Sequence, residues 1–165
     1  MKSIKTNPGK ILLIGIGNSG RGDDGLGWKF TDMVKELDYP FIDYEYRYQL
    51  QVEDTSLICM YDTVIFADAS HADLENGFEI KTCGPAQHYF FSSHVQSPET
   101  ILYLARDLYN KTPEAYTVAI SGNYWELTTS MSEEAEKNLQ AAYTFFIKDF
   151  LPVLISRINS RKVLE

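Results

Sequence analysis

The stretch that decides the fold is GIGNSGRGDDGLG, Gly15–Gly27, which directly follows the apolar run ILLI at 11–14. A short apolar run that stops at glycines is typical of a buried β-strand. Behind the glycines, apolar residues recur at helical spacing, at Leu26, Phe30, Met33, Val34 and Leu37. This pattern predicts a helix from about Asp24 to Leu37, with Asp23 or Asp24 as its N-cap. Strand, glycine turn and helix are the first unit of an α/β fold.

The rest of the chain continues this alternation. We expect further strands in PFIDYEYRY, DTVIFADAS, GFEIKTC and AYTVAIS, and helices in VEDTSLICMY, after Ser97 and near the C-terminus. The continuous apolar run of DTVIFADAS is typical of a fully buried strand, whereas GFEIKTC is expected at an edge. The prediction is an α/β three-layer sandwich, with a twisted, mostly parallel sheet and helices on both faces, formed by residues 1–165 as a single domain.

Helix ends are also marked in the sequence. Ser97 followed by Pro98 predicts a capped helix start. Ser130 and Glu133 have the spacing of a capping box. Pro152 is expected to kink or break the last helix, because proline lacks the backbone N–H that the helix needs.

Composition excludes several classes of function. A net charge of −8 and a pI of about 4.9 argue against nucleic-acid binding, which needs a basic face. No apolar run approaches the ~18 residues of a membrane span, and the N-terminus has no apolar segment of a signal peptide. Cys59 and Cys83 form no CxxC pattern. We therefore expect a cytoplasmic monomer with two free thiols and no membrane partner.

The glycine spacing raises one alternative, dinucleotide binding. Gly15, Gly17 and Gly20 match GxGxxG after a strand. In that motif the helix opens at the third glycine, so that its N-terminus faces the pyrophosphate. Here Asp23 and Asp24 lie at that place, and a close pair of like charges at intermediate dielectric costs about 4 kcal/mol. A P-loop is excluded because GK[ST] is absent.

The other alternative is that the loop delivers a carboxylate to a cation. Asp24 follows the first strand and Asp68 ends another, and ligands of doubly wound sheets bind at the carboxyl ends of strands. His94 lies in a loop before a helix and could reach the same edge. Two carboxylates and an imidazole suit a metal with open coordination positions. Each residue alone has a simpler reading: Asp24 as a helix cap, Asp68 as an acceptor of loop N–H groups, and His94 as a polar loop residue.

GIGNSGRGDDGLG resembles the N-terminal motif of the hydrogenase maturation proteases, which trim the C-terminus of nickel-iron hydrogenase large subunits. YDTVIFADAS resembles the second motif of that family, and SSHVQSPETILYLARDLY resembles the third. VAISGNYWEL followed by MSEEAEKNL is similar to the last strand, loop and helix of the family. The resemblance therefore covers most of the chain, with its motifs in the family's order.

The resemblance implies that Asp24, Asp68 and His94 are the catalytic and metal-binding residues. It implies that the metal is nickel, supplied by the hydrogenase large-subunit precursor on which the enzyme acts. Two stretches depart from the family: YRYQLQVED stands where many members have a Gly-Gly-Thr-like sequence, and Val95 follows His94. Both departures bear on which precursor is recognised and leave the three site residues in place.

Peptide hydrolysis needs a polarised carbonyl and an activated water. The sequence has no HExxH helix and no evident Ser/His/Asp or Cys/His set. A metal on Asp24, Asp68 and His94 would supply Lewis-acid chemistry, whereas an aspartic-type endopeptidase would use the two aspartates directly. A non-catalytic module that recognises a metalloprotein subunit and a nucleotide-binding enzyme remain as alternatives to a protease.

Overall fold

A computed structural model describes residues 9–88 and 96–164 of the chain. A five-stranded sheet has the strand order β2-β1-β3-β5-β4. The strands are β1 (Ile11–Ile16), β2 (Ile42–Arg47), β3 (Thr63–Ser70), β4 (Phe78–Cys83) and β5 (Glu114–Ser121). All pairings are parallel except that of β4 with β5. The predicted α/β class and the mostly parallel sheet are therefore confirmed.

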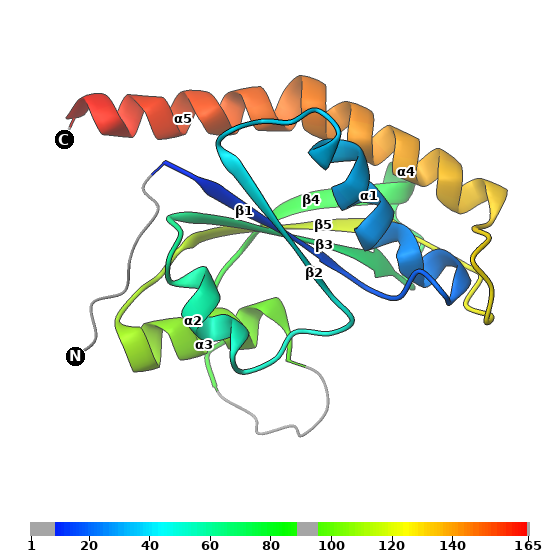
Figure 1. Cartoon of the computed structure of the whole chain (residues 1–165), viewed down its shortest axis with the longest axis horizontal. Coiled ribbons are helices and arrows are strands. Elements are labelled where there is room, and N and C mark those ends of the chain that lie inside the picture. Colours follow the sequence, from blue (N-terminus) through cyan, green and yellow to red (C-terminus); the bar gives the residue numbers. More distant parts are fainter. Residues whose placement is uncertain (1–8, 89–95, 165) are drawn as a thin grey trace.

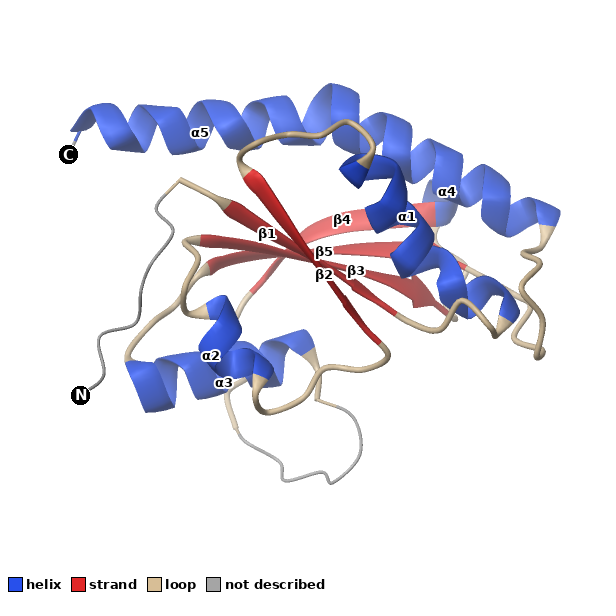
Figure 2. Ribbon diagram, viewed as in Figure 1, coloured by secondary structure: helices blue, strands red, loops and turns tan. Residues whose placement is uncertain are grey.

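Helices cover both faces of the sheet, as Figures 1 and 2 show. They are α1 (Leu26–Lys35), α2 (Asp54–Ile58), α3 (Pro98–Tyr109), α4 (Glu133–Phe145) and α5 (Leu151–Leu164). One face packs against α1, α4 and α5 and the other against α2 and α3, which gives a separate apolar core on each side. Successive side chains of β3 point to opposite faces of the sheet. Ile65 and Ala67 therefore pack in the first core, and Val64 and Phe66 pack in the second.

The chain order creates a switch point between β1 and β3. From β1 the chain crosses through α1 to β2 on one side, and after β3 it continues to β4 and β5 on the other side. Connections that leave neighbouring strands in opposite directions open a crevice at the carboxyl ends of those strands. The loop formed by residues 17–25 follows β1 at this crevice, and Asp68 lies two residues before the end of β3.

The glycines of the first motif serve close backbone packing. A Cβ on Gly27 would lie 2.3 Å from the carbonyl oxygen of Ile16 and 2.4 Å from that of Ala67. Gly17 has a φ of +142°, and a Cβ there would lie 2.0 Å from the carbonyl oxygen of Asp24. Helix α1 can therefore start directly against the ends of β1 and β3 only because these positions lack side chains.

Two of the three predicted helix N-caps need correction. Neither Asp23 nor Asp24 caps α1: a 3-10 turn, Gly22–Gly25, precedes the helix, and Gly25 is its N-cap without a side-chain bond. The cap of α4 is Ser132, whose hydroxyl accepts from the Ala135 N–H, and not Ser130. The cap of α3 by Ser97, with Pro98 following, is confirmed.

Pro152 does not break the last helix. The chain passes from α4 through a π-helical turn, Phe146–Phe150, into α5, and Pro152 is the second residue of α5. A π turn has a wider ring of backbone hydrogen bonds, so it accommodates the missing N–H of a proline that follows it. The long helix α4–α5 that results spans the top of the molecule in Figure 1.

Candidate active site

The loop after β1 is tied to the loop between β5 and α4. Gly22 N–H donates to the carbonyl of Thr128 at 2.8 Å, and Asp23 N–H donates to that of Tyr124 at 2.7 Å. The side chain of Asp23 is fully buried between the same two loops. Both loops follow strands at their carboxyl ends, so these bonds build one wall of the crevice.

Asp23 is the anchor of this wall. Its carboxylate accepts hydrogen bonds from the backbone N–H groups of Asn123, Tyr124 and Ser132 at 2.9, 2.9 and 2.8 Å. It also accepts from the Ser132 hydroxyl at 2.8 Å, which in turn caps α4. Although burial raises the pKa of Asp23, these donors outweigh it and hold the pKa below its usual value. Asp23 is thus a structural carboxylate that stays ionised.

The side chain of Asp24 does not take part in this hydrogen-bond network, and among the described residues it makes no hydrogen bond to a helix end. Burial is the main cause that raises its pKa. The charges of Arg21 and His71 and the backbone N–H of Asn18 act in the opposite direction. The two adjacent aspartates of the loop therefore have different roles: Asp23 is satisfied by protein donors, whereas Asp24 is half-buried and left for another partner.

Asp68 is the second carboxylate of the crevice. Its Oδ1 accepts the Ala69 backbone N–H at 2.8 Å. Burial is the main cause that raises the pKa of Asp68 to about 7; the nearby negative charge of Asp24 acts in the same direction, and the Ala69 bond acts against it. The two predicted aspartates are thus brought together, close enough to repel each other. A pair of poorly solvated carboxylates with few protein donors suits a divalent cation, whose charge removes this repulsion.

His94 lies outside the described residues. Gln96, with which the described chain resumes, forms a β-bridge with Leu50, which follows β2 beyond its carboxyl end. Helix α3 then packs on the face of the sheet toward which Val64 and Phe66 point. Asp68 is two residues beyond Phe66 in β3, so it lies on the same face of the strand. Within the described part of the chain, no group of three His, Cys, Asp or Glu side chains lies close enough to hold a metal. The convergence of Asp24, Asp68 and His94 therefore stays a prediction.

His71 is a site residue that the sequence analysis missed. It directly follows β3, and it lies near enough to Asp24 to lower the pKa of that carboxyl. Its ring stacks on Trp125, with ring centroids 3.8 Å apart and planes at 25°. Its place just after the predicted strand DTVIFADAS was the one available signal, since a residue just beyond a strand end lies at the crevice.

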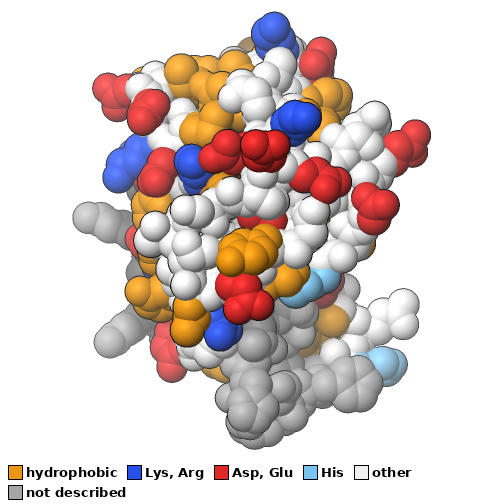
Figure 3. Space-filling model, turned by 90° about the vertical axis from the view of Figure 1, so that its right-hand side faces the viewer, with side chains coloured by type: hydrophobic (Ala, Val, Ile, Leu, Met, Phe, Trp, Pro, Cys, Tyr) orange, Lys and Arg blue, Asp and Glu red, His pale blue; other side chains and the backbone are white. Residues whose placement is uncertain are grey.

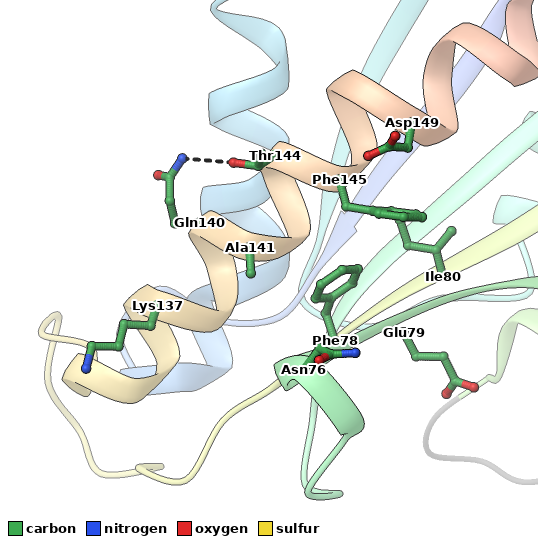
Figure 4. Close-up of a pocket in the computed structure, with 10 residues that line it drawn as sticks. All are labelled: Asn76, Phe78, Glu79, Ile80, Lys137, Gln140, Ala141, Thr144, Phe145 and Asp149. Carbon is green, nitrogen blue, oxygen red and sulfur yellow. Dashed lines mark hydrogen bonds between the residues drawn. The ribbon is translucent and has the colours of Figure 1, made fainter.

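A wide groove lies away from these residues. It has a volume of about 820 Å³ and lies between β4 and the helix formed by α4 and the π turn (Figure 4). Phe78, Ile80 and Phe145 form its apolar floor, and the bond from Gln140 to Thr144 crosses its helical side at 3.4 Å. Its lining offers Glu79, Asp149 and Lys137 as isolated charges. The converging carboxylates of the crevice, and not this groove, are the candidate chemical centre.

Searches against protein-family models and curated protein sequences give no match to this chain. Solved structures do match. The [NiFe] hydrogenase maturation protease HycI of Thermococcus kodakarensis is 20% identical, with a TM-score of 0.66 over 89% of this chain and 96% of that one. The hydrogenase maturating endopeptidase HybD of E. coli is 16% identical, with a TM-score of 0.64 over 82% and 88%. The hydrogenase 2 maturation peptidase of a Thaumarchaeota archaeon is 17% identical, with a TM-score of 0.59 over 86% and 99%. The chain shares the fold of these proteins over nearly their whole length.

Proposed function

We propose that this protein is a metal-dependent endopeptidase that removes the C-terminal extension of a nickel-iron hydrogenase large-subunit precursor. The observation that carries the proposal is the pair Asp24 and Asp68, two partly desolvated carboxylates at the switch point of the sheet. The sequence motifs around both residues resemble those of the maturation proteases, and the fold is the one that such proteases adopt.

In this proposal the nickel belongs to the substrate. Asp24 and Asp68 hold it together with His94, which the sequence resemblance assigns. When bound, the ion supplies Lewis-acid polarisation of the scissile carbonyl. Because the carboxylates repel each other without a cation, a precursor that carries the metal binds with a gain that an empty precursor cannot provide. Selectivity for the loaded precursor follows from this difference in binding.

The other residues position this pair. Asp23 fixes the loop that carries Asp24 against the loop before α4, and Gly17 and Gly27 let that loop lie against the strand ends. The Ala69 N–H orients Asp68. A direct aspartic-type reaction would use the raised pKa of Asp68, which favours a proton on that carboxyl near neutral pH beside the carboxyl of Asp24.

Purified protein incubated with nickel-loaded and nickel-free precursor tests the proposal. We expect mass spectrometry to show loss of the C-terminal peptide from the loaded precursor alone. Asp24→Asn and Asp68→Asn should each abolish this cleavage, whereas an exposed carboxylate variant on α3, Asp107→Asn, should cleave at the wild-type rate. Cleavage by Asp68→Asn but not by Asp24→Asn would contradict a role for the pair.

Two outcomes would identify a different function. If the wild-type protein binds the loaded precursor and never cleaves it, the protein is a recognition module and not a protease. If it cleaves both precursors equally in the presence of a chelator, the reaction is of the aspartic type and needs no metal.

The proposal also includes a cytoplasmic monomer, for which size-exclusion chromatography should give a mass near 18.9 kDa. Within the part of the chain that the structure describes, no helix is long and apolar enough to cross a membrane.

A further inference from the structure

Two loops at the crevice are joined by an aromatic stack that the proposed chemistry does not use. His71 follows β3, and Trp125 lies in the loop between β5 and α4. Their rings stack with centroids 3.8 Å apart. Since β3 and β5 are neighbours in the sheet, the stack spans the carboxyl ends of two adjacent strands.

Trp125 is the fixed member of this stack. A Cβ on Gly122 would lie 3.0 Å from Cη2 of the indole and 2.7 Å from Cβ of Asp23, so the ring lies directly over the backbone at Gly122. The hydrogen bonds from Asn123 and Tyr124 to the Asp23 carboxylate hold the chain just before Trp125. The indole is therefore a rigid platform on which His71 rests.

His71 has spare hydrogen-bonding capacity. Its side chain is exposed despite the stack, and neither ring nitrogen bonds to a residue in 9–88 or 96–164. The same imidazole lies near enough to Asp24 for its charge to act on that carboxylate. An imidazole held in place beside a reactive group, with both nitrogens open, is arranged to contact a bound molecule.

A cavity of about 260 Å³ lies beside this imidazole. It is lined by His71, Ala72, Asp73, Ser121, Gly122, Asn123 and Glu134. Acidic side chains are spread over the face of the molecule that Figure 3 shows. Small-molecule sites typically have about 300–1,000 Å³, so this smaller cavity suits one side chain of a polypeptide.

We propose that a polar side chain of the precursor, next to the cleaved peptide bond, enters this cavity. His71, held on Trp125, binds that side chain by a hydrogen bond. The inference rests on the proposed function, because that function supplies the polypeptide. His71 is here a substrate-binding residue and not a metal ligand, since among the described residues it completes no metal-binding group with the two aspartates.

His71→Phe separates hydrogen bonding from stacking, because phenylalanine keeps an aromatic ring for Trp125 and removes both nitrogens. The probe is nickel-free precursor, which is bound without being cut, and the readout is its Kd by calorimetry. We expect His71→Phe to weaken binding about tenfold, with an unchanged thermal unfolding midpoint. His88→Phe, the same change at another exposed histidine, should leave the Kd unchanged. An additional nickel titration of His71→Phe with the free ion should match the wild type.

Equal Kd values for His71→Phe and the wild type would overturn the inference and leave His71 as a packing partner of Trp125. A changed nickel titration would overturn it in favour of a metal ligand. Failure of the proposed function is seen separately, as absence of cleavage of the nickel-loaded precursor by the wild type. A wild type that binds neither precursor would overturn both.

Discussion

Replacing Asp68 by asparagine is expected to stabilise the protein at neutral and alkaline pH. Asparagine has the same shape, and its side-chain oxygen can still accept the Ala69 N–H that Asp68 accepts at 2.8 Å. What it removes is a charge that burial and the neighbouring Asp24 both disfavour. The variant therefore isolates the cost of ionising this carboxyl in the folded protein.

The magnitude follows from the pKa of Asp68, about 7 in the folded state against about 3.9 in an unfolded chain. Because the folded state binds this proton more tightly, the stability that the group contributes is fully present below pH 4 and is lost as the pH rises through 7. The full loss amounts to about 4 kcal/mol, of which about 2 kcal/mol falls between pH 5.5 and pH 9. Asp68→Asn lacks this loss.

Urea unfolding at pH 5.5, 7 and 9, with a chelator present, measures the effect. We expect the difference in unfolding free energy between Asp68→Asn and the wild type to grow by about 2 kcal/mol in favour of the variant from pH 5.5 to pH 9. Asp107→Asn, at an exposed position of α3, should show no such growth. A difference that stays constant with pH would refute the reasoning, because it would mean that Asp68 ionises in the folded protein as it does in water.

The remaining predictions concern the loop and the metal site. Asp23→Ala should lower the free energy of unfolding by about 3 kcal/mol in urea titrations, because it leaves buried N–H donors without their acceptor. Ser132→Ala should lower it by about 1 kcal/mol through loss of the α4 cap, with the same assay. Asp24→Asn should abolish precursor processing on gels without lowering the thermal midpoint, because Asp24 caps no helix; wild-type processing would contradict this. His94→Ala should also abolish processing, and a variant that still trims nickel-loaded precursor would remove His94 from the site.

The arrangement of strands and helices was largely predictable. Apolar runs that end at glycines or aspartates predicted β1 and β3, and GFEIKTC was expected to be an edge strand, which β4 is. The sequence of β1, β2 and β3 separated by helices predicted parallel pairing. These features depend on local apolar patterns and on the short connections of the chain, so they can be read without the tertiary structure.

Helix ends were less predictable than helix centres. Aspartate is a common N-cap residue, yet the carboxylate of Asp23 accepts hydrogen bonds from backbone N–H groups about a hundred residues later in the chain. Pro152 follows a π turn that relieves it, although its local sequence predicts a break. For Asp23 a distant hydrogen-bond partner decides the outcome, and for Pro152 a backbone distortion that the sequence does not mark. Local propensity decides neither.

The sequence by itself determined the α/β layering and the placement of Asp24 after one strand and of Asp68 near the end of another, because the period of apolar residues and the approximate position of a strand end are local properties. Only the tertiary structure decided that the two carboxylates lie near enough to repel each other, that Asp23 is satisfied and Asp24 is not, and that His71 meets Trp125 beside them. These relations join β1, β3 and the loop after β5, which are far apart in the chain. Burial and charge–charge distance, which set the pKa of Asp68, exist only after those segments have packed together.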